Sequence, residues 1–251
     1  LPYPLIGNYG IAPEDFESRR LFLTGLLVKE ACRYPSNWRH RHTLGEFLET
    51  SGVPGIEGLD TRALVRHLRT CGAMRGVIGD IGGSTESLVK HARAHPSMAG
   101  CDLASVVTKD EQFDWQEGRH LLHIRGGRSR QSGLFDQPRM KVVAIDYGIK
   151  WNILRCLIDT GCDVTVVPAT MTASDILALK PDGVLLSNGP GDPDPVEYAV
   201  HSIRALIGKL PIFGICLGHQ LLAIAAGGRT YKLKFGHRGG NHPVIDLETG
   251  R

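Results

Sequence analysis

From Lys141 onward, short apolar runs alternate with segments of helical periodicity. The runs are rich in β-branched residues and apolar at consecutive positions, as in strands buried on both faces of a sheet. Their alternation with helical segments predicts a parallel sheet with crossover helices, in four β–α units. The predicted strands are KVVAID (141–146), DVTVVP (163–168), DGVLLS (182–187) and LPIFGI (210–215).

The segments between these strands have the spacing of amphipathic helices. KWNILRCLIDTG (150–161) puts Ile153, Leu154, Leu157 and Ile158 on one face, and Gly161 is a natural stop. PVEYAVHSIRALIG (195–208) shows the same pattern and opens at Pro195. We therefore expect helices over both segments.

Residues 1 to about 117 have a different pattern. LFLTGLLV (21–28) is β-like, and LDTRALVRHLRTCG (59–72) predicts a helix that Asp60 or Thr61 caps and Gly72 ends. An Arg-, Gly- and Ser-rich stretch without periodicity, 117–140, follows. The fold prediction is a smaller α+β domain (1–135, with this linker at its end) before an α/β domain (136–251).

Composition narrows the function classes. The net charge of +3, from 29 basic and 26 acidic residues, is too small to indicate a nucleic-acid partner. No apolar run approaches the roughly 20 residues of a membrane span, and the first residues lack a signal-peptide layout, so we expect a cytoplasmic protein without a membrane partner. Neither the six cysteines nor His40 and His42, which lie beside arginines, have metal-ligand spacing, so no metal is predicted.

One cysteine has a special setting. In FGICLGHQLLA (213–223), Cys216 lies between two glycines, directly after a predicted strand and before an apolar helical run. This G-x-C-x-G spacing predicts a nucleophile elbow, with Cys in place of Ser. The other five cysteines are interpreted as small buried apolar residues.

The helix after Cys216 would serve the same chemistry. Its unpaired N–H groups and the positive end of its dipole would face the sulfur, which favours the thiolate form. The N–H of Leu217 would also lie where an oxyanion hole needs a donor. The pattern therefore indicates acyl transfer through a covalent intermediate.

A second motif, LLSNGPGDPDP (185–195), follows the third predicted strand, at the sheet edge where open α/β folds bind ligands. Gly189 and Gly191 would let backbone N–H groups approach a substrate. Taken alone, this sequence is an ordinary turn. Its position one β–α unit before Cys216 favours a role in the site.

Together these motifs resemble the class I glutamine amidotransferases, and four segments resemble more narrowly the small subunit of carbamoyl-phosphate synthetase. Three segments of the first half are similar to that subunit's own N-terminal domain. The seven segments are AIDYGIKWNILR (144–155), LSNGPGDP (186–193), FGICLGHQLLA (213–223), KFGHRGGNHPV (234–244), YPLIGNYG (3–10), LDTRALVRHLR (59–69) and CDLASVVT (101–108).

The resemblance implies that Cys216 attacks the glutamine side-chain amide and that Leu217 and Gly189 form the oxyanion hole. It also implies that Gly189, Gly191, Leu217 and Gln220 bind glutamine. An amide one helical turn past the nucleophile can both donate to and accept from an amino acid, although a capping or surface role for Gln220 is the alternative.

The resemblance implies no cofactor on this chain. Ammonia would pass to a large subunit that uses ATP, Mg²⁺ and bicarbonate to make carbamoyl phosphate for arginine synthesis, pyrimidine synthesis or both. Lys150 would line the ammonia exit or be solvated.

The sequence lacks the segment that carries the catalytic base in the family it resembles. The family's histidine and glutamate lie in an H-P-E segment, which does not occur here; a Q-N-H-G loop and a serine expected before Leu1 are also missing. We therefore expect a subunit truncated at both ends. His219 is assigned a structural role, whereas His237 and His242 stay open as bases.

Two other functions fit the same residues. The chain could be a catalytically silent binding or regulatory fragment of this subunit, with its motifs intact and its base missing. It could also be a thiol hydrolase or the amidotransferase of another synthetase, such as that for anthranilate or guanylate, on a shared fold.

Overall fold

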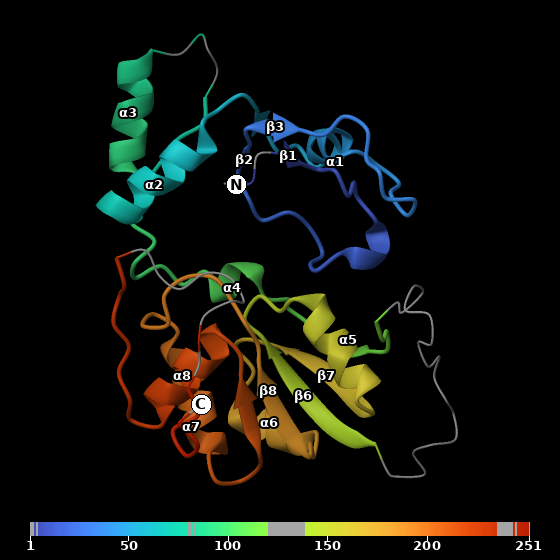
Figure 1. Cartoon of the computed structure of the whole chain (residues 1–251). Helices are drawn as coiled ribbons and strands as arrows, with labels where there is room; N and C mark the ends of the chain where they lie inside the picture. Colours follow the sequence, from blue (N-terminus) through green and yellow to red (C-terminus); the bar gives the residue numbers. More distant parts are fainter. Residues whose placement is uncertain are drawn as a thin grey trace.

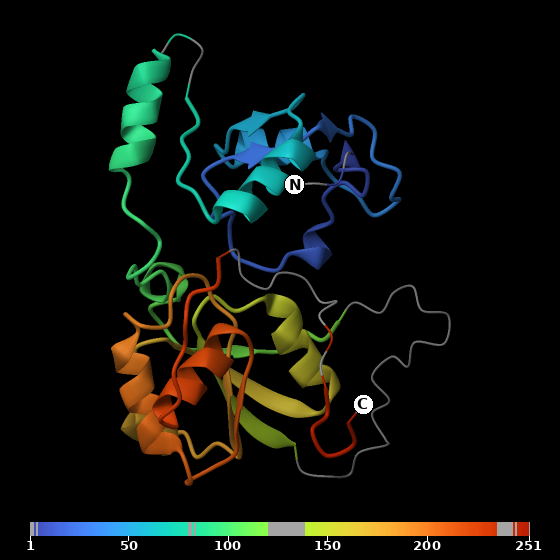
Figure 2. The same cartoon turned by 60° about the vertical axis from the view of Figure 1, so that its left-hand side comes forward.

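A computed structural model of the 251-residue chain describes residues 3, 5–79, 82, 84–119, 139–234, 243 and 245–250. Figures 1 and 2 show an N-terminal part, which carries α1 to α3, beside a part built on a large sheet. The predicted boundary near residue 135 lies outside the described residues and stays a prediction. No helix of the described chain is long and apolar enough to cross a membrane.

The large sheet has the strand order β5-β7-β6-β8-β9, in which only β5 is antiparallel to its neighbour. Its four parallel strands confirm the four predicted ones, with ends shifted by up to two residues. Sequence reasoning missed β5, which comes from the first half of the chain and forms one edge of the sheet. The strands are β5 (Phe113–Trp115), β6 (Met140–Asp146), β7 (Cys162–Pro168), β8 (Gly183–Leu186) and β9 (Ile212–Gly214).

Alternating side chains of the strands supply a core on each face of the sheet. Val143 and Ile145 of β6 point into one core, whereas Ala144 points into the other. The first core packs against α6, α7 and α8, and the second against α5. The helices are α5 (Trp151–Asp159), α6 (Ala173–Ala178), α7 (Glu197–Leu206) and α8 (Leu217–Ala225).

The N-terminal part consists of helices and very short strands, which agrees with the predicted α+β pattern. Two parallel pairs of strands are formed, β1 with β3 and β2 with β4. The elements are β1 (Leu5–Ile6), a 3-10 helix (Pro13–Asp15), β2 (Leu26–Leu27), β3 (Glu30–Ala31), α1 (Leu44–Thr50), β4 (Gly55–Ile56), α2 (Thr61–Cys71) and α3 (Thr85–Ala94). The short helix α4 (Ala104–Val107) follows them and belongs to the sheet part, since its Ala104 is buried in the first core.

The strand predicted over 21–28 was wrong for most of its length. Only Leu26 and Leu27 pair with another strand. Phe22 is exposed, and the guanidinium groups of Arg19 and Arg20 lie 5.6 and 4.6 Å from its ring centroid. Its side chain therefore serves as a platform for two cations rather than as part of a ladder.

The helix predicted over 59–72 is confirmed as α2, and the structure identifies its cap. The carboxylate of Asp60 accepts a hydrogen bond of 2.9 Å from the N–H of Ala63. Gly72 ends the helix with a φ of +94°, which a residue with a side chain would adopt only under strain.

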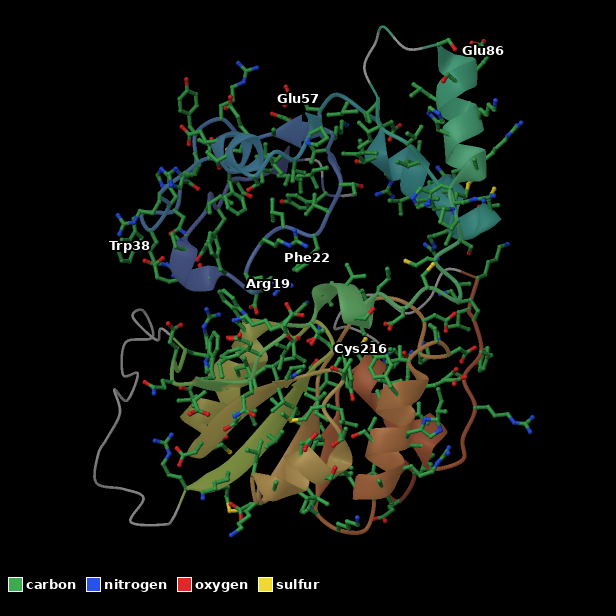
Figure 3. All side chains as sticks on the ribbon, turned by 180° about the vertical axis from the view of Figure 1, so that it is seen from behind. Arg19, Phe22, Trp38, Glu57, Glu86 and Cys216 are labelled. Atoms are coloured by element: carbon green, nitrogen blue, oxygen red, sulfur yellow. The ribbon has the colours of Figure 1, made fainter. Side chains whose placement is uncertain are left out.

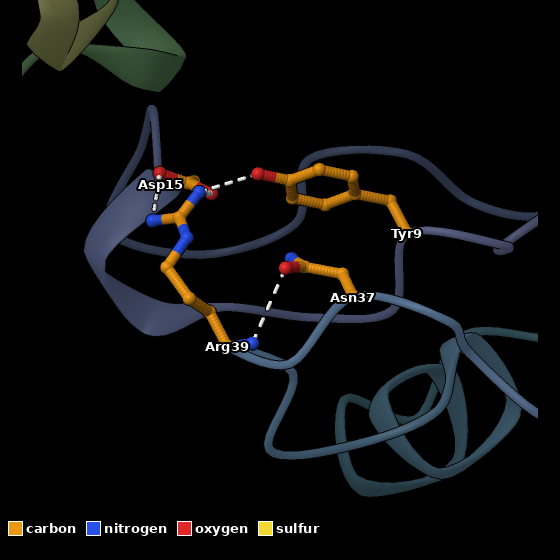
Figure 4. A network of polar contacts seen from close by, with 4 residues as sticks. All are labelled: Tyr9, Asp15, Asn37 and Arg39. Atoms are coloured by element: carbon orange, nitrogen blue, oxygen red, sulfur yellow. Dashed lines mark hydrogen bonds and ion pairs between the residues drawn. The ribbon is translucent and has the colours of Figure 1, made fainter. Parts of the chain in front are cut away.

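One polar network fixes the loops of the N-terminal part (Figure 4). Arg39 donates to both carboxylate oxygens of Asp15, at 3.0 and 2.6 Å, and also to the hydroxyl of Tyr9. The backbone N–H of Arg39 donates to Asn37. The hydrogen bond to Asp15 raises the pKa of Arg39 above its ordinary value, so the guanidinium stays charged and bidentate.

The two parts are joined by hydrogen bonds that span long stretches of sequence. Glu17 accepts from the first two N–H groups of α5: its carbonyl from Trp151 at 3.1 Å and its carboxylate from Asn152 at 2.8 Å. The guanidinium of Arg19 donates to the carbonyl of Thr108 at 3.2 Å. Glu17 therefore caps a helix of the other part.

Replacing Glu17 by Ala should lower the free energy of unfolding by about 0.5–1 kcal/mol, because the N–H of Asn152 loses its carboxylate acceptor. Urea unfolding followed by circular dichroism measures this change. Glu17→Gln, which keeps an acceptor oxygen, should lose less than Glu17→Ala, and an equal loss in both variants would contradict the capping role.

Candidate functional site

Cys216 lies at the junction of β9 and α8, as the sequence predicted. Its φ of 54° and ψ of −108° belong to a region that a residue with a side chain rarely adopts. Such a conformation costs on the order of 1–3 kcal/mol, so the surrounding structure must hold it in place. The thiol is exposed, and Figure 3 shows it at the end of the sheet part that faces the N-terminal elements.

The two glycines around Cys216 allow α8 to approach the sheet. A Cβ built on Gly218 would lie 2.3 Å from the carbonyl oxygen of Leu186 in β8, and one on Gly214 would lie 2.7 Å from the N–H nitrogen of His219. Neither glycine has a positive φ. The glycines therefore serve close packing, whereas the strained backbone is that of Cys216 itself.

The loop after β8 lies directly against this elbow. A Cβ on Gly189 would lie 2.7 Å from the Cδ2 atom of Leu217 and 2.3 Å from the carbonyl oxygen of Tyr147. The structure thus brings Gly189 and Leu217, the two predicted oxyanion donors, side by side. Because no room exists for a side chain at Gly189, only glycine lets this loop pack against Tyr147 and Leu217.

The N–H groups of Gly189 and Leu217 are both available. Within the described residues, neither N–H donates a hydrogen bond to a protein acceptor. The next N–H along α8, that of Gly218, is already used by the carbonyls of Ser187 and Ile215, each at 3.0 Å. A free N–H on the residue after Cys216, with another on the loop that packs against that residue, forms an arrangement that can stabilise an oxyanion.

Residues that precede the sheet cover the far end of the same loop. Gly191 has a φ of +92°. A Cβ built on it would lie 3.3 Å from the Cβ of Leu103 and 3.4 Å from the carbonyl oxygen of Cys101. The N–H of Gly100 donates to the carboxylate of Asp192 at 3.3 Å. The site is therefore shaped by both halves of the chain.

Gln220 lies one turn along α8 from Cys216 and is exposed. Its N–H donates to the carbonyl of Cys216 at 3.0 Å, which closes the first turn of the helix. Its side chain has no hydrogen bond within the described residues and can receive a ligand. His219 is exposed on the same turn, whereas His237 and His242 lie outside the described residues.

Three buried or half-buried polar residues near the site were not found by sequence reasoning. Asp146, at the end of β6, accepts from the N–H groups of Gly148 and Ile149 at 2.9 and 2.8 Å and from that of Lys109 at 3.2 Å. Ser187 and Asn188 hold the loop after β8. All three lie within the segments 144–155 and 185–195 quoted above, but nothing in those segments indicates a role for these side chains.

The phenol of Tyr147 lies under the site. It is fully buried, its hydroxyl has no hydrogen-bond partner among the described residues, and burial raises its pKa above the ordinary value. Since ionisation would need a charge in an apolar core, this side chain remains neutral. The described part of the chain contains no group of three potential metal ligands.

Comparisons with known proteins agree with this architecture. Residues 143–250 match the family described as glutamine amidotransferase class-I, which is the class that the elbow and sheet define. Residues 1–78 match the carbamoyl-phosphate synthase small chain, CPSase domain. These two matches lie on either side of the predicted domain boundary.

The relatives that the chain matches include two proteins named carbamoyl phosphate synthase small chain. That of Syntrophotalea carbinolica is 60% identical over 244 residues, which are 97% of this chain and 64% of the relative. That of Xanthomonas axonopodis pv. citri is 48% identical over 265 residues, which cover this whole chain and 67% of the relative. The chain belongs to the carbamoyl phosphate synthase small chain family, and it spans about two thirds of the length of these relatives.

Among solved structures, a putative GMP synthase component from Thermoplasma acidophilum is 29% identical. The likeness covers 36% of this chain and 47% of that chain with a TM-score of 0.32, an overlap too low to support an argument about the fold.

Replacing Gly218 by Ala should lower the free energy of unfolding by about 1–3 kcal/mol, because the added methyl group forces α8 away from the carbonyl of Leu186. Urea unfolding measures the change. Gly45→Ala in α1 is the control: the nearest neighbouring atom would lie 3.9 Å from the new Cβ, and the variant should be more stable by up to about 1 kcal/mol. Equal behaviour of the two variants would contradict the packing argument.

Proposed function

We propose that the protein hydrolyses the side-chain amide of glutamine at Cys216 and delivers the ammonia to a separate synthetase subunit. The observation that carries this proposal is the strained cysteine beside the two free N–H groups of Gly189 and Leu217. Membership of the small-chain family supports the same reaction. Because the chain spans about two thirds of its relatives' length, the activity is proposed for the full-length subunit that contains it.

In the proposed reaction, the deprotonated sulfur of Cys216 attacks the amide carbon, and a C–S bond forms as the C=O π electrons move to oxygen. The N–H groups of Leu217 and Gly189 stabilise the oxyanion. Removal of one such donor typically slows an enzyme by about 10²–10³-fold. The C–N bond then breaks, the nitrogen takes up a proton and leaves as ammonia, and a γ-glutamyl thioester remains.

Water completes the cycle by attacking the thioester, which gives glutamate and restores the thiol. The proton transfers need a general acid–base, and no described histidine is hydrogen-bonded to Cys216. By resemblance to the family, a histidine of the full-length subunit would supply this group. Ammonia remains a nucleophile only while it is unprotonated, so the proposed route leads directly to the partner.

We assign glutamine binding to Gly189, Gly191, Leu217 and Gln220. The three backbone positions border the elbow or the loop beside it, and the Gln220 side chain is exposed one turn away. An amide can donate to the α-carboxylate of the substrate or accept from its ammonium group. The partner that this proposal requires is the large synthetase subunit, which would bind ATP.

Replacing Cys216 by Ser should abolish glutamine-dependent synthesis of carbamoyl phosphate, because a hydroxyl group is not ionised near neutral pH. Ammonia-dependent synthesis by the same complex should remain unchanged, since it does not pass through this site. Product formation by the purified complex of both full-length subunits, with either nitrogen source, measures both rates. Equal loss of both would overturn the role of Cys216.

Replacing Gln220 by Leu should raise the KM for glutamine about 10-fold or more and change kcat by less than about threefold. The reason is that a hydrogen bond to a charged group contributes about 1.5–3 kcal/mol. Glutamate release from the same complex measures both constants. His219→Ala, one residue away and outside the proposed machinery, should leave KM within about twofold, and an unchanged KM in Gln220→Leu would contradict the assignment.

A further inference from the structure

Ser187 is fully buried at the end of β8, and all of its polar groups are used. Its N–H donates to the carbonyl of Ile145 at 3.2 Å, which continues the sheet ladder. The remaining groups hold three segments that meet at the site: the end of β6, the loop after β8 and the first turn of α8.

The hydroxyl of Ser187 accepts a hydrogen bond of 2.9 Å from the N–H of Tyr147. It donates one of 2.7 Å to the carbonyl of Asn188. Because the backbone N–H can only donate, the hydroxyl proton is left for Asn188, and the direction of both bonds is fixed. A methyl group at this position could make neither bond.

The bond to Asn188 determines where the N–H of Gly189 points. The carbonyl of Asn188 and the N–H of Gly189 belong to the same planar trans peptide unit, in which they point in opposite directions. A hydroxyl that holds the carbonyl oxygen on one side therefore turns the N–H to the other side. Gly189 cannot fix this direction itself, since glycine has few conformational restraints.

The carbonyl of Ser187 acts on the other donor. It accepts a hydrogen bond of 3.0 Å from the N–H of Gly218, the residue after Leu217. The first turn of α8 is thus tied to the same residue that orients the Gly189 peptide. The relative position of the two donors depends on Ser187.

The loop is also held from its other side, so Ser187 alone does not keep it in place. The side chain of Asn188 accepts from the N–H of Lys150 and donates to the carbonyl of Gly148, both at 3.0 Å. Loss of the Ser187 hydroxyl would therefore release the orientation of one peptide without releasing the whole loop.

We propose that Ser187 is a positioning residue of the oxyanion hole: its hydroxyl sets the direction of the Gly189 N–H, and its carbonyl keeps Leu217 in register with it. This inference rests on the proposed glutamine hydrolysis at Cys216. Ser187 would act on the oxyanion only through its neighbours, Gly189 and Leu217.

The test uses the complex of full-length subunits with Ser187→Ala, and Ser187→Cys as a variant of similar volume with a weak donor. Glutamate release should show kcat lowered about 10–100-fold in Ser187→Ala and at least about fivefold in Ser187→Cys, with KM within about threefold. Misdirecting one donor should cost at most what its removal costs, typically about 10²–10³-fold.

Alkylation by iodoacetamide separates positioning from a structural role. The Cys216 sulfur displaces iodide from a tetrahedral carbon, so the reaction needs the nucleophile but forms no oxyanion. The alkylation rate due to Cys216 is the rate that Cys216→Ser abolishes in the same protein. In both Ser187 variants this rate should stay within about threefold of its wild-type value. A parallel fall of alkylation and hydrolysis would mean a displaced elbow and would overturn the inference.

Wild type and Cys216→Ser distinguish failure of this inference from failure of the proposed function. Cys216-dependent hydrolysis in wild type, combined with a normal kcat in either Ser187 variant, would overturn the positioning role alone. Absence of Cys216-dependent hydrolysis in wild type would overturn both, because no oxyanion would then be formed at this site.

Discussion

The close approach of α8 to the carboxyl end of β8 is the constraint on which the site depends. The backbone of Gly218 lies against the carbonyl of Leu186, and its N–H is bound by Ser187. This contact fixes the start of α8, and with it the unfavourable backbone conformation of Cys216. Strain at one residue is thus maintained by packing at its neighbours, which themselves are unstrained.

The sequence predicted the parallel strands, the crossover helices and the elbow because each rests on local information. Strand periodicity, the glycines at 214 and 218 and the cap of α2 are all visible within a few residues. The short strands of the first half could not be predicted in this way, because two-residue pairings depend on which distant segment lies alongside. The assumption that 21–28 pairs throughout failed for that reason: Phe22 instead contacts two arginines.

The candidate site likewise combines residues whose roles the local sequence reveals with residues whose roles it does not. The roles of Cys216, Leu217 and the glycine loop are recognisable from motifs. Those of Ser187 and Asp146 are not, although both lie within the quoted segments, because these roles rest on hydrogen bonds to segments that are distant along the chain or belong to its first half. A serine after a strand is common, and only its partners distinguish this one. The roles assigned to individual residues remain predictions that the kinetic variants address.

The edge strand β5 limits how the protein can be divided. Phe113, Asp114 and Trp115 precede the predicted boundary near residue 135, yet they pair with Val166, Thr165 and Val164 of β7. A fragment that begins after this boundary would leave that side of β7 unpaired, with its backbone N–H and C=O groups open to another chain. Such a fragment should self-associate through strand pairing, so expression of the C-terminal half should include residues from at least Thr108 onward.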